Sequence, residues 1–166
     1  MHSVYQFVAG PLTWAAFLIF FGGIVFRLVR MISLARKTEP FIFTYMSLKY
    51  SLRSILHWVV PFASIRWRTS PIITLVTFAF HVCLIATPVF LLAHVILWDE
   101  ALSLKWWALP DKTADVMTLI VIACCVFFAI RRIVSPEARF VTDRSDYLLL
   151  ALTAAPFVTG FLAFHQ

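Results

Sequence analysis

Four long apolar runs dominate the hydrophobic pattern of the chain, and a helix needs about 20 such residues to cross a bilayer. The runs cover residues 11–31, 71–98, 115–130 and 147–164. The first run has Pro11 in its first turn, where proline is tolerated, and its Gly22-Gly23 pair would let another helix approach closely. The pattern predicts an all-α membrane protein with four transmembrane helices.

A further segment, residues 41–62, is long enough to span but carries Lys49 and Arg53 near its middle, one helical turn apart. Each charge costs about 3 kcal/mol at the centre of a transmembrane helix. A helix lying in the plane of the membrane surface avoids that cost. We therefore predict an interfacial amphipathic helix between the first and second spans. Its lipid-facing side would consist of Phe41, Tyr45, Leu48, Leu52 and Leu56.

The composition agrees with lipid as the main solvent. The chain has 166 residues, of which 62% are hydrophobic and 13% charged, and its mean hydropathy is +0.92. Soluble domains carry about 25% charged residues, so this chain lacks the polar surface to face water all round. We expect residues 1–166 to form a single transmembrane domain with no separate soluble one.

The basic residues are distributed unevenly between the loops. Eight of the 14 Lys and Arg residues fall within residues 27–68, two within residues 99–114 and four within residues 131–144. Lys and Arg concentrate in cytoplasmic loops, which predicts cytoplasmic first and third loops and both termini outside. The net charge of +6 then indicates contact with anionic lipid, and no nucleic-acid partner is expected.

Two further features bear on processing and redox chemistry. The N-terminus has no basic region and no clear cleavage site, so we interpret the first run as a retained helix and not as a signal peptide. Cys83, Cys124 and Cys125 lie inside apolar runs and show no metal-type spacing. We expect all three to pack as small hydrophobic residues.

Two histidines in the second run are the strongest chemical signal. His81 lies about 15 Å from the cytoplasmic start of this run, and His94 lies about 20 Å further on, near the outer face. Histidine within a span is costly and usually functional, and neutral imidazole is a good axial ligand for haem iron. Two imidazoles at two depths suit two stacked haems that carry electrons across the bilayer.

An alternative interpretation requires no cofactor. His81 would form a hydrogen bond to a neighbouring helix, and His94 would sit at the interface. On an ideal helix the two side chains also point about 140° apart, although Pro88 between them predicts a kink. His165 ends the fourth span at the outer face, where a histidine needs no special role, and His2 and His57 are expected at the surface.

Other chemistry has no support in the sequence. The chain shows no carboxylate pair, serine triad, Gly-rich phosphate loop or metal-type cysteine cluster. Hydrolytic and group-transfer reactions are therefore not expected.

A motif beyond the third run resembles a known family. The stretch RRIVSPEAR, residues 131–139, is followed by Ser145-Asp146 and another span, and Phe80-His81 is followed by a second histidine. This arrangement resembles the gamma subunit of respiratory nitrate reductase and related cytochrome b subunits of membrane redox complexes in sulfate-reducing bacteria. The resemblance extends from the first span to the fourth.

The resemblance implies a di-haem b-type cytochrome in the bacterial cytoplasmic (inner) membrane. Quinol from the quinone pool would be oxidised near the outer face, and electrons would pass through up to two haems b to a cytoplasmic iron–sulfur or catalytic subunit. His81 would ligate the inner haem iron and His94 the outer one. The candidates for the quinol site are His94, Trp107 and Lys112, with Leu109 and Pro110 nearby.

The chain departs from that family in one respect. The family has a fifth span whose two histidines supply the opposite axial ligands, and this sequence stops before it. We therefore expect a chain truncated at its C-terminus. His165 could complete the outer haem, because the second and fourth spans both run outward.

Two other functions remain open. A haem-free membrane anchor or assembly protein would dock cytoplasmic partners on its basic face, and the missing ligands favour that function. A small transporter or channel has less support, because the spans show no charged relay beyond His81 and no broken-helix repeat.

Overall fold

A computed structural model of the protein describes residues 6–63 and 65–166, and every regular element in these residues is a helix. The chain divides into two compact units, Met1–His57 and Trp58–Gln166. Four helical segments are long and apolar enough to cross a membrane: Gly10–Thr38, Pro71–Phe90, Asp111–Val134 and Arg144–Phe164. The predicted all-α architecture with four membrane-spanning helices is thus confirmed. The surface position of residues 41–62 and the outer location of the termini stay predictions.

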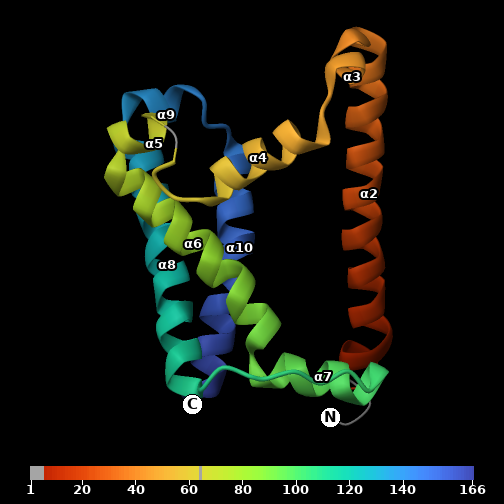
Figure 1. The fold of residues 1–166 in the computed structure, drawn as a ribbon. Helices are drawn as coiled ribbons and strands as arrows, with labels where there is room; N and C mark the ends of the chain where they lie inside the picture. Colours follow the sequence, from red (N-terminus) through yellow and green to blue (C-terminus); the bar gives the residue numbers. More distant parts are fainter. Residues whose placement is uncertain (1–5, 64) are drawn as a thin grey trace. The chain divides into compact units, whose positions relative to one another are not determined.

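The first unit contains one long helix followed by short ones (Figure 1). A π-helical turn, η1 (Val8–Leu12), leads into α2 (Thr13–Thr38). Because α2 continues to Thr38, the first span is longer than the predicted residues 11–31. No residue of α2 is buried within its own unit.

The segment predicted as one interfacial helix forms two helices. They are α3 (Phe41–Tyr45) and α4 (Leu48–Val59). The backbone is extended at Met46, with φ −71° and ψ 119°. The expected single helix over residues 41–62 is therefore wrong in its length, and its amphipathic part is α4.

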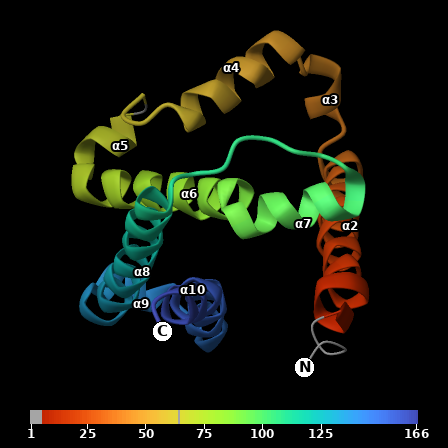
Figure 2. The same cartoon turned by 90° about the horizontal axis from the view of Figure 1, so that it is seen from below.

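The second unit is built around α8 (Asp111–Val134), which packs against both α6 (Pro71–Phe90) and α10 (Arg144–Phe164) (Figure 2). Phe80 and Cys83 of α6 meet Val121, Cys124 and Cys125 of α8 in the core. Partly buried Leu150, Ala154 and Phe157 of α10 pack against the same cluster. The three cysteines are free and buried, which confirms that they pack as small apolar residues.

The helix ends in this unit follow local rules. Asp143 and Asp146 form a capping box at the start of α10, where the Asp146 carboxylate accepts the Asp143 N–H at 2.8 Å. In α8, Asp111 lies in the first turn and Arg131 and Arg132 in the last, which complements the helix dipole. This helix extends about one turn beyond the predicted residues 115–130 at each end. The loop predicted over residues 133–146 contains α9 (Pro136–Phe140).

The second span differs most from expectation. The predicted single helix over residues 71–98 is wrong: α6 ends at Phe90, and a separate helix, α7 (Leu92–Leu102), follows. Leu91 between them is extended, with φ −65° and ψ 130°. Figures 1 and 2 show α7 running on from the end of α6 and away from the α8–α10 pair, at the level where α8 begins. The polar loop predicted over residues 99–114 shrinks to residues 103–110, because its two ends are helical.

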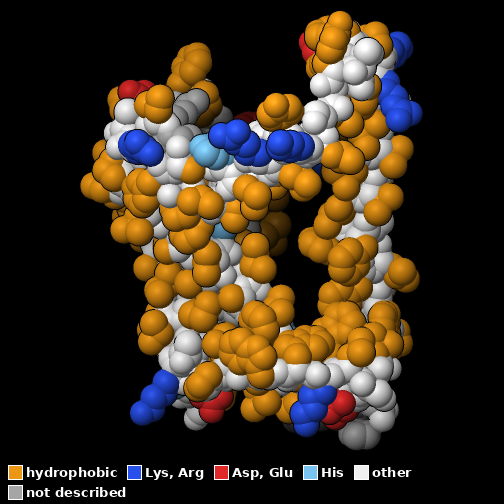
Figure 3. Space-filling view, viewed as in Figure 1, with side chains coloured by type: hydrophobic (Ala, Val, Ile, Leu, Met, Phe, Trp, Pro, Cys, Tyr) orange, Lys and Arg blue, Asp and Glu red, His pale blue; other side chains and the backbone are white. Residues whose placement is uncertain are grey.

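Charges of the second unit gather at its two ends, while apolar side chains cover the visible sides of its long helices (Figure 3). One end carries α5 (Ile65–Thr69), the end of α8, α9 and the start of α10. Its charged side chains include five arginines and three carboxylates, namely Arg68, Arg131, Arg132, Arg139, Arg144, Glu137, Asp143 and Asp146. The opposite end carries two lysines and four carboxylates. They are Lys105, Lys112, Asp99, Glu100, Asp111 and Asp115. The unit is therefore basic at one end and acidic at the other.

Core packing at Val121 yields a prediction about stability. This side chain is 0% exposed, so Val121→Phe should lower the free energy of unfolding by about 1–3 kcal/mol through overpacking. Thermal unfolding in detergent, followed by circular dichroism, measures the change. The control is Val116→Phe on the same helix, because Val116 is 56% exposed. Equal stability of the two variants would contradict the packing of α8 at the centre of this unit.

Candidate functional site

His81 occupies the middle of α6 and is exposed on the surface of the helix bundle. Its Nδ1 lies 2.7 Å from the carbonyl oxygen of Thr77, one turn earlier. A carbonyl only accepts, so Nδ1 carries the proton and donates it. In the neutral ring this leaves Nε2 with its lone pair, and Nε2 has no partner within the described part of the chain. In metal-bound histidines one ring nitrogen binds the metal, and the N–H of the other nitrogen is held by an acceptor such as a carbonyl. The bond to Thr77 would hold His81 in the same way.

The end of α6 leaves three main-chain carbonyls without their usual helical partners, those of Pro88, Val89 and Phe90. Each finds a replacement donor. His94 Nδ1 lies 2.7 Å from the Pro88 oxygen, Trp106 Nε1 donates to the Val89 oxygen at 2.9 Å, and Leu109 N–H donates to the Phe90 oxygen at 2.8 Å. In a membrane an unpaired main-chain carbonyl is costly, so these three bonds allow the helix to stop here.

His94 therefore has a structural hydrogen bond as well as a second ring nitrogen that is available to bind a metal. It lies on α7 and not on the same helix as His81, so the prediction that both histidines lie on one helix, kinked at Pro88, does not hold. Its Nδ1 donates to a carbonyl, so the neutral form of the ring has its lone pair on Nε2. No described side chain bonds that nitrogen.

The return segment, residues 103–110, runs back beside α7 toward the start of α8 (Figure 2). Trp107 stacks on Phe90 with ring centroids 4.6 Å apart, and Trp106 lies 6.2 Å from Trp98. Lys105 pairs loosely with Asp99 at 4.0 Å. Aromatic contacts and the two carbonyl bonds therefore hold this segment against the end of α6.

His165 is engaged by a carboxylate. Its Nε2 lies 3.3 Å from Asp115 Oδ2, which joins the end of α10 to the start of α8. The ring also packs 4.4 Å from that of Phe161. Iron ligation by this nitrogen would compete with the Asp115 contact, so His165 is less free than His81 or His94.

The predicted quinol-site residues are not joined by direct contacts. His94 bonds the end of α6, and Trp107 stacks on Phe90. Lys112 is exposed in the first turn of α8. Among the described residues it bonds neither of the other two. All three lie at the acidic end of the second unit, and the structure shows no closer association between them.

Two residues of this region were missed by sequence analysis. Trp106 was not singled out, yet its indole N–H donates to the carbonyl oxygen of Val89. Asp115 was not singled out, yet it pairs with His165. The pairing of Asp115 could have been found from the sequence, because the start of one span and the end of the next, antiparallel span lie at the same level in the membrane.

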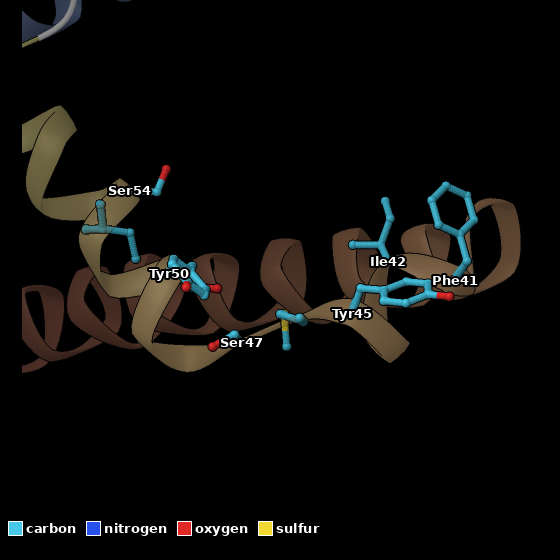
Figure 4. Close-up of a pocket in the computed structure, with 9 residues that line it drawn as sticks. Phe41, Ile42, Tyr45, Ser47, Tyr50 and Ser54 are labelled. Carbon is cyan, nitrogen blue, oxygen red and sulfur yellow. The ribbon is translucent and has the colours of Figure 1, made fainter.

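An open groove of about 630 Å³ lies at the junction of α3 and α4 (Figure 4). Figure 4 shows Tyr45, Tyr50 and the hydroxyls of Ser47 and Ser54 along it. Its lining contains no histidine, cysteine or charged side chain, so it offers no imidazole or thiolate to haem iron. Within the described residues, no three His, Cys, Asp or Glu side chains group as a metal-ion site; an axial haem ligand requires only one imidazole.

Comparison with known proteins gives one relative. A protein of Nitratidesulfovibrio vulgaris (strain Hildenborough) is 38% identical over 168 residues, which cover 96% of this chain and 73% of that protein. This chain belongs to the same family. The relative is described only as "Protein", so membership of this family assigns no activity. No family model matches the chain, and no solved structure matches it.

The capping of α6 leads to a testable expectation. Trp106→Phe keeps an aromatic ring but removes the N–H that bonds Val89, and should lower the free energy of unfolding by about 1 kcal/mol. Thermal unfolding in detergent measures the loss. Trp107→Phe is the matched control, since a phenyl ring still stacks on Phe90. If the two variants melt alike, the indole bond does not hold the end of the helix.

Proposed function

We propose that this protein is the membrane cytochrome b subunit of a respiratory redox complex. It would oxidise a quinol at its acidic end and pass electrons to an iron–sulfur or catalytic subunit at its basic, cytoplasmic end. The observation that carries the proposal is the free Nε2 of His81, which lies in the middle of a spanning helix while its Nδ1 donates to Thr77. The resemblance of residues 131–139 to nitrate reductase gamma subunits points the same way.

The donor chemistry of two histidines fits haem b. His81 and His94 each offer one Nε2 lone pair with the opposite nitrogen fixed by a main-chain carbonyl, and such a bond orients a ligating ring. His81 would hold an inner haem and His94 an outer one. When bound, haem supplies one-electron redox chemistry. His165 would serve the outer haem only after leaving Asp115.

The fold determines what the protein's own residues contribute. The α6–α7 break keeps the His94 ring against Pro88 at the end of the bundle, and Trp107 on Phe90 covers the same end. Apolar helices exclude water along the path between the two ends. We place the basic end in the cytoplasm of a bacterium and both termini outside, because Lys and Arg favour the inner side of the bacterial cytoplasmic membrane.

A haem-free anchor or assembly subunit is the second candidate. It is favoured by the capping bond of His94 and by the ion pair of His165, since both histidines then have structural roles without iron. In that case the arginines at the basic end would dock cytoplasmic partners. The two candidates differ in whether purified protein contains haem.

The test is a reduced-minus-oxidised absorption spectrum of the purified chain, with haem counted per protein. A b-type spectrum is expected, and His81→Ala should remove one haem while the fold is kept. His57→Ala is the control, because it removes an exposed histidine of α4. His94→Ala should remove the other haem, whereas Trp106→Phe, which loosens the same helix end, should retain it. Haem content unchanged in both histidine variants would exclude these ligands, and its absence from the wild type would favour the anchor.

The two arginines in the last turn of α8 provide an independent expectation. Arg131→Ala combined with Arg132→Ala should disturb membrane orientation or partner docking and leave the haem content unchanged. Arg132 also reaches the carbonyl of Asp146 at 3.5 Å, so thermal unfolding is measured in parallel. Cysteine-labelling of the loop from each side of the membrane reports orientation. Loss of haem with an unchanged melting temperature would contradict this division of roles.

A further inference from the structure

The short helix α4 carries a surface that none of the proposed redox chemistry uses. All of its described residues are at least partly exposed, and no residue of the helix is buried. At 100° per residue, Leu48, Leu52 and Ile55 fall within about 60° of one another. They are 77%, 59% and 60% exposed. This apolar stripe therefore has no partner within its own unit.

A basic stripe runs beside the apolar one. Lys49, Arg53 and His57 follow at intervals of four residues, so they lie on one side of the helix. Figure 3 shows Lys, Arg and His side chains in a row over α4. No Asp or Glu occurs between Glu39 and Asp99. Nothing on the helix or near it in sequence neutralises the row.

The remaining side of α4 carries hydroxyl groups. Tyr50, Ser51 and Ser54 lie there and line the groove of Figure 4 together with Ser47. The helix thus presents an apolar stripe, a basic stripe and a hydroxyl stripe. A bilayer surface offers acyl chains below and phosphates and glycerol oxygens above, which matches all three. An acidic protein surface would match the basic stripe but leave the leucines in water.

We propose that α4 is a docking surface for anionic phospholipid. Leu48, Leu52 and Ile55 insert among the acyl chains, and Lys49 and Arg53 bind the phosphates of anionic headgroups. A basic side chain at an anionic membrane surface favours association by about 5-fold, so the two together select anionic over zwitterionic lipid. This binding does not depend on haem or on a partner subunit.

The test places a nitroxide on α4 of the full-length protein in vesicles. Leu52→Cys and, separately, Ile55→Cys are labelled, because the three native cysteines are buried. Collision of the nitroxide with oxygen reports lipid, and collision with a water-soluble nickel complex reports water. The vesicles contain phosphatidylcholine alone or phosphatidylcholine mixed with phosphatidylglycerol. We expect both labels to be lipid-exposed, and more so with phosphatidylglycerol.

Charge variants decide the specificity. Lys49→Gln with Arg53→Gln should abolish the difference between the two vesicle types, as should high salt. Lys105→Gln with Lys112→Gln is the matched control and should leave the difference intact, because these lysines lie outside α4. Labels that remain water-exposed in both vesicle types would overturn the proposal, and so would equal behaviour of the two double variants. If α4 instead binds an acidic protein, the labels should remain water-exposed in both vesicle types.

Discussion

The need to satisfy every main-chain carbonyl in an apolar surrounding governs the end of α6, and the half of the second unit in which α8 begins is arranged around it. A helix that stops within or at the edge of hydrocarbon exposes carbonyls that water does not reach. Here three successive carbonyls receive donors from His94, Trp106 and Leu109. Those donors come from α7 itself and from the return segment that follows it, so the helix, the return segment and the start of α8 form one connected structure.

The sequence predicted the four spans because each is a long apolar run, and a bilayer demands that length. It predicted the buried cysteines for the same reason. The end of α6 at Phe90 was not predictable from hydropathy, because residues 91–98 are as apolar as those before them. Pro88 indicated a disturbance of this helix. The extended backbone at Leu91 depends on donors as distant as Trp106 and Leu109, which hydropathy does not reveal.

The candidate site was predicted in its components and not in its arrangement. His81 is conspicuous in the sequence, because a histidine among apolar residues is rare. The partner of its Nδ1 is one turn away, but local spacing alone does not select that bond over others. His94 seemed to share a helix with His81, and it lies instead on the next helix. The pairing of Asp115 with His165 is a contact between two spans, so it depends on how α8 and α10 pack.

The buried thiols of the second unit have a practical consequence for observing its motions. Cys83 on α6 and Cys124 and Cys125 on α8 are 7%, 7% and 4% exposed, and Cys124 lies 3.6 Å from the carbonyl oxygen of Val76 across the interface. A maleimide reaches them only when α6 and α8 separate. The rate at which the native thiols react thus reports how often this helix pair opens, without any engineered probe.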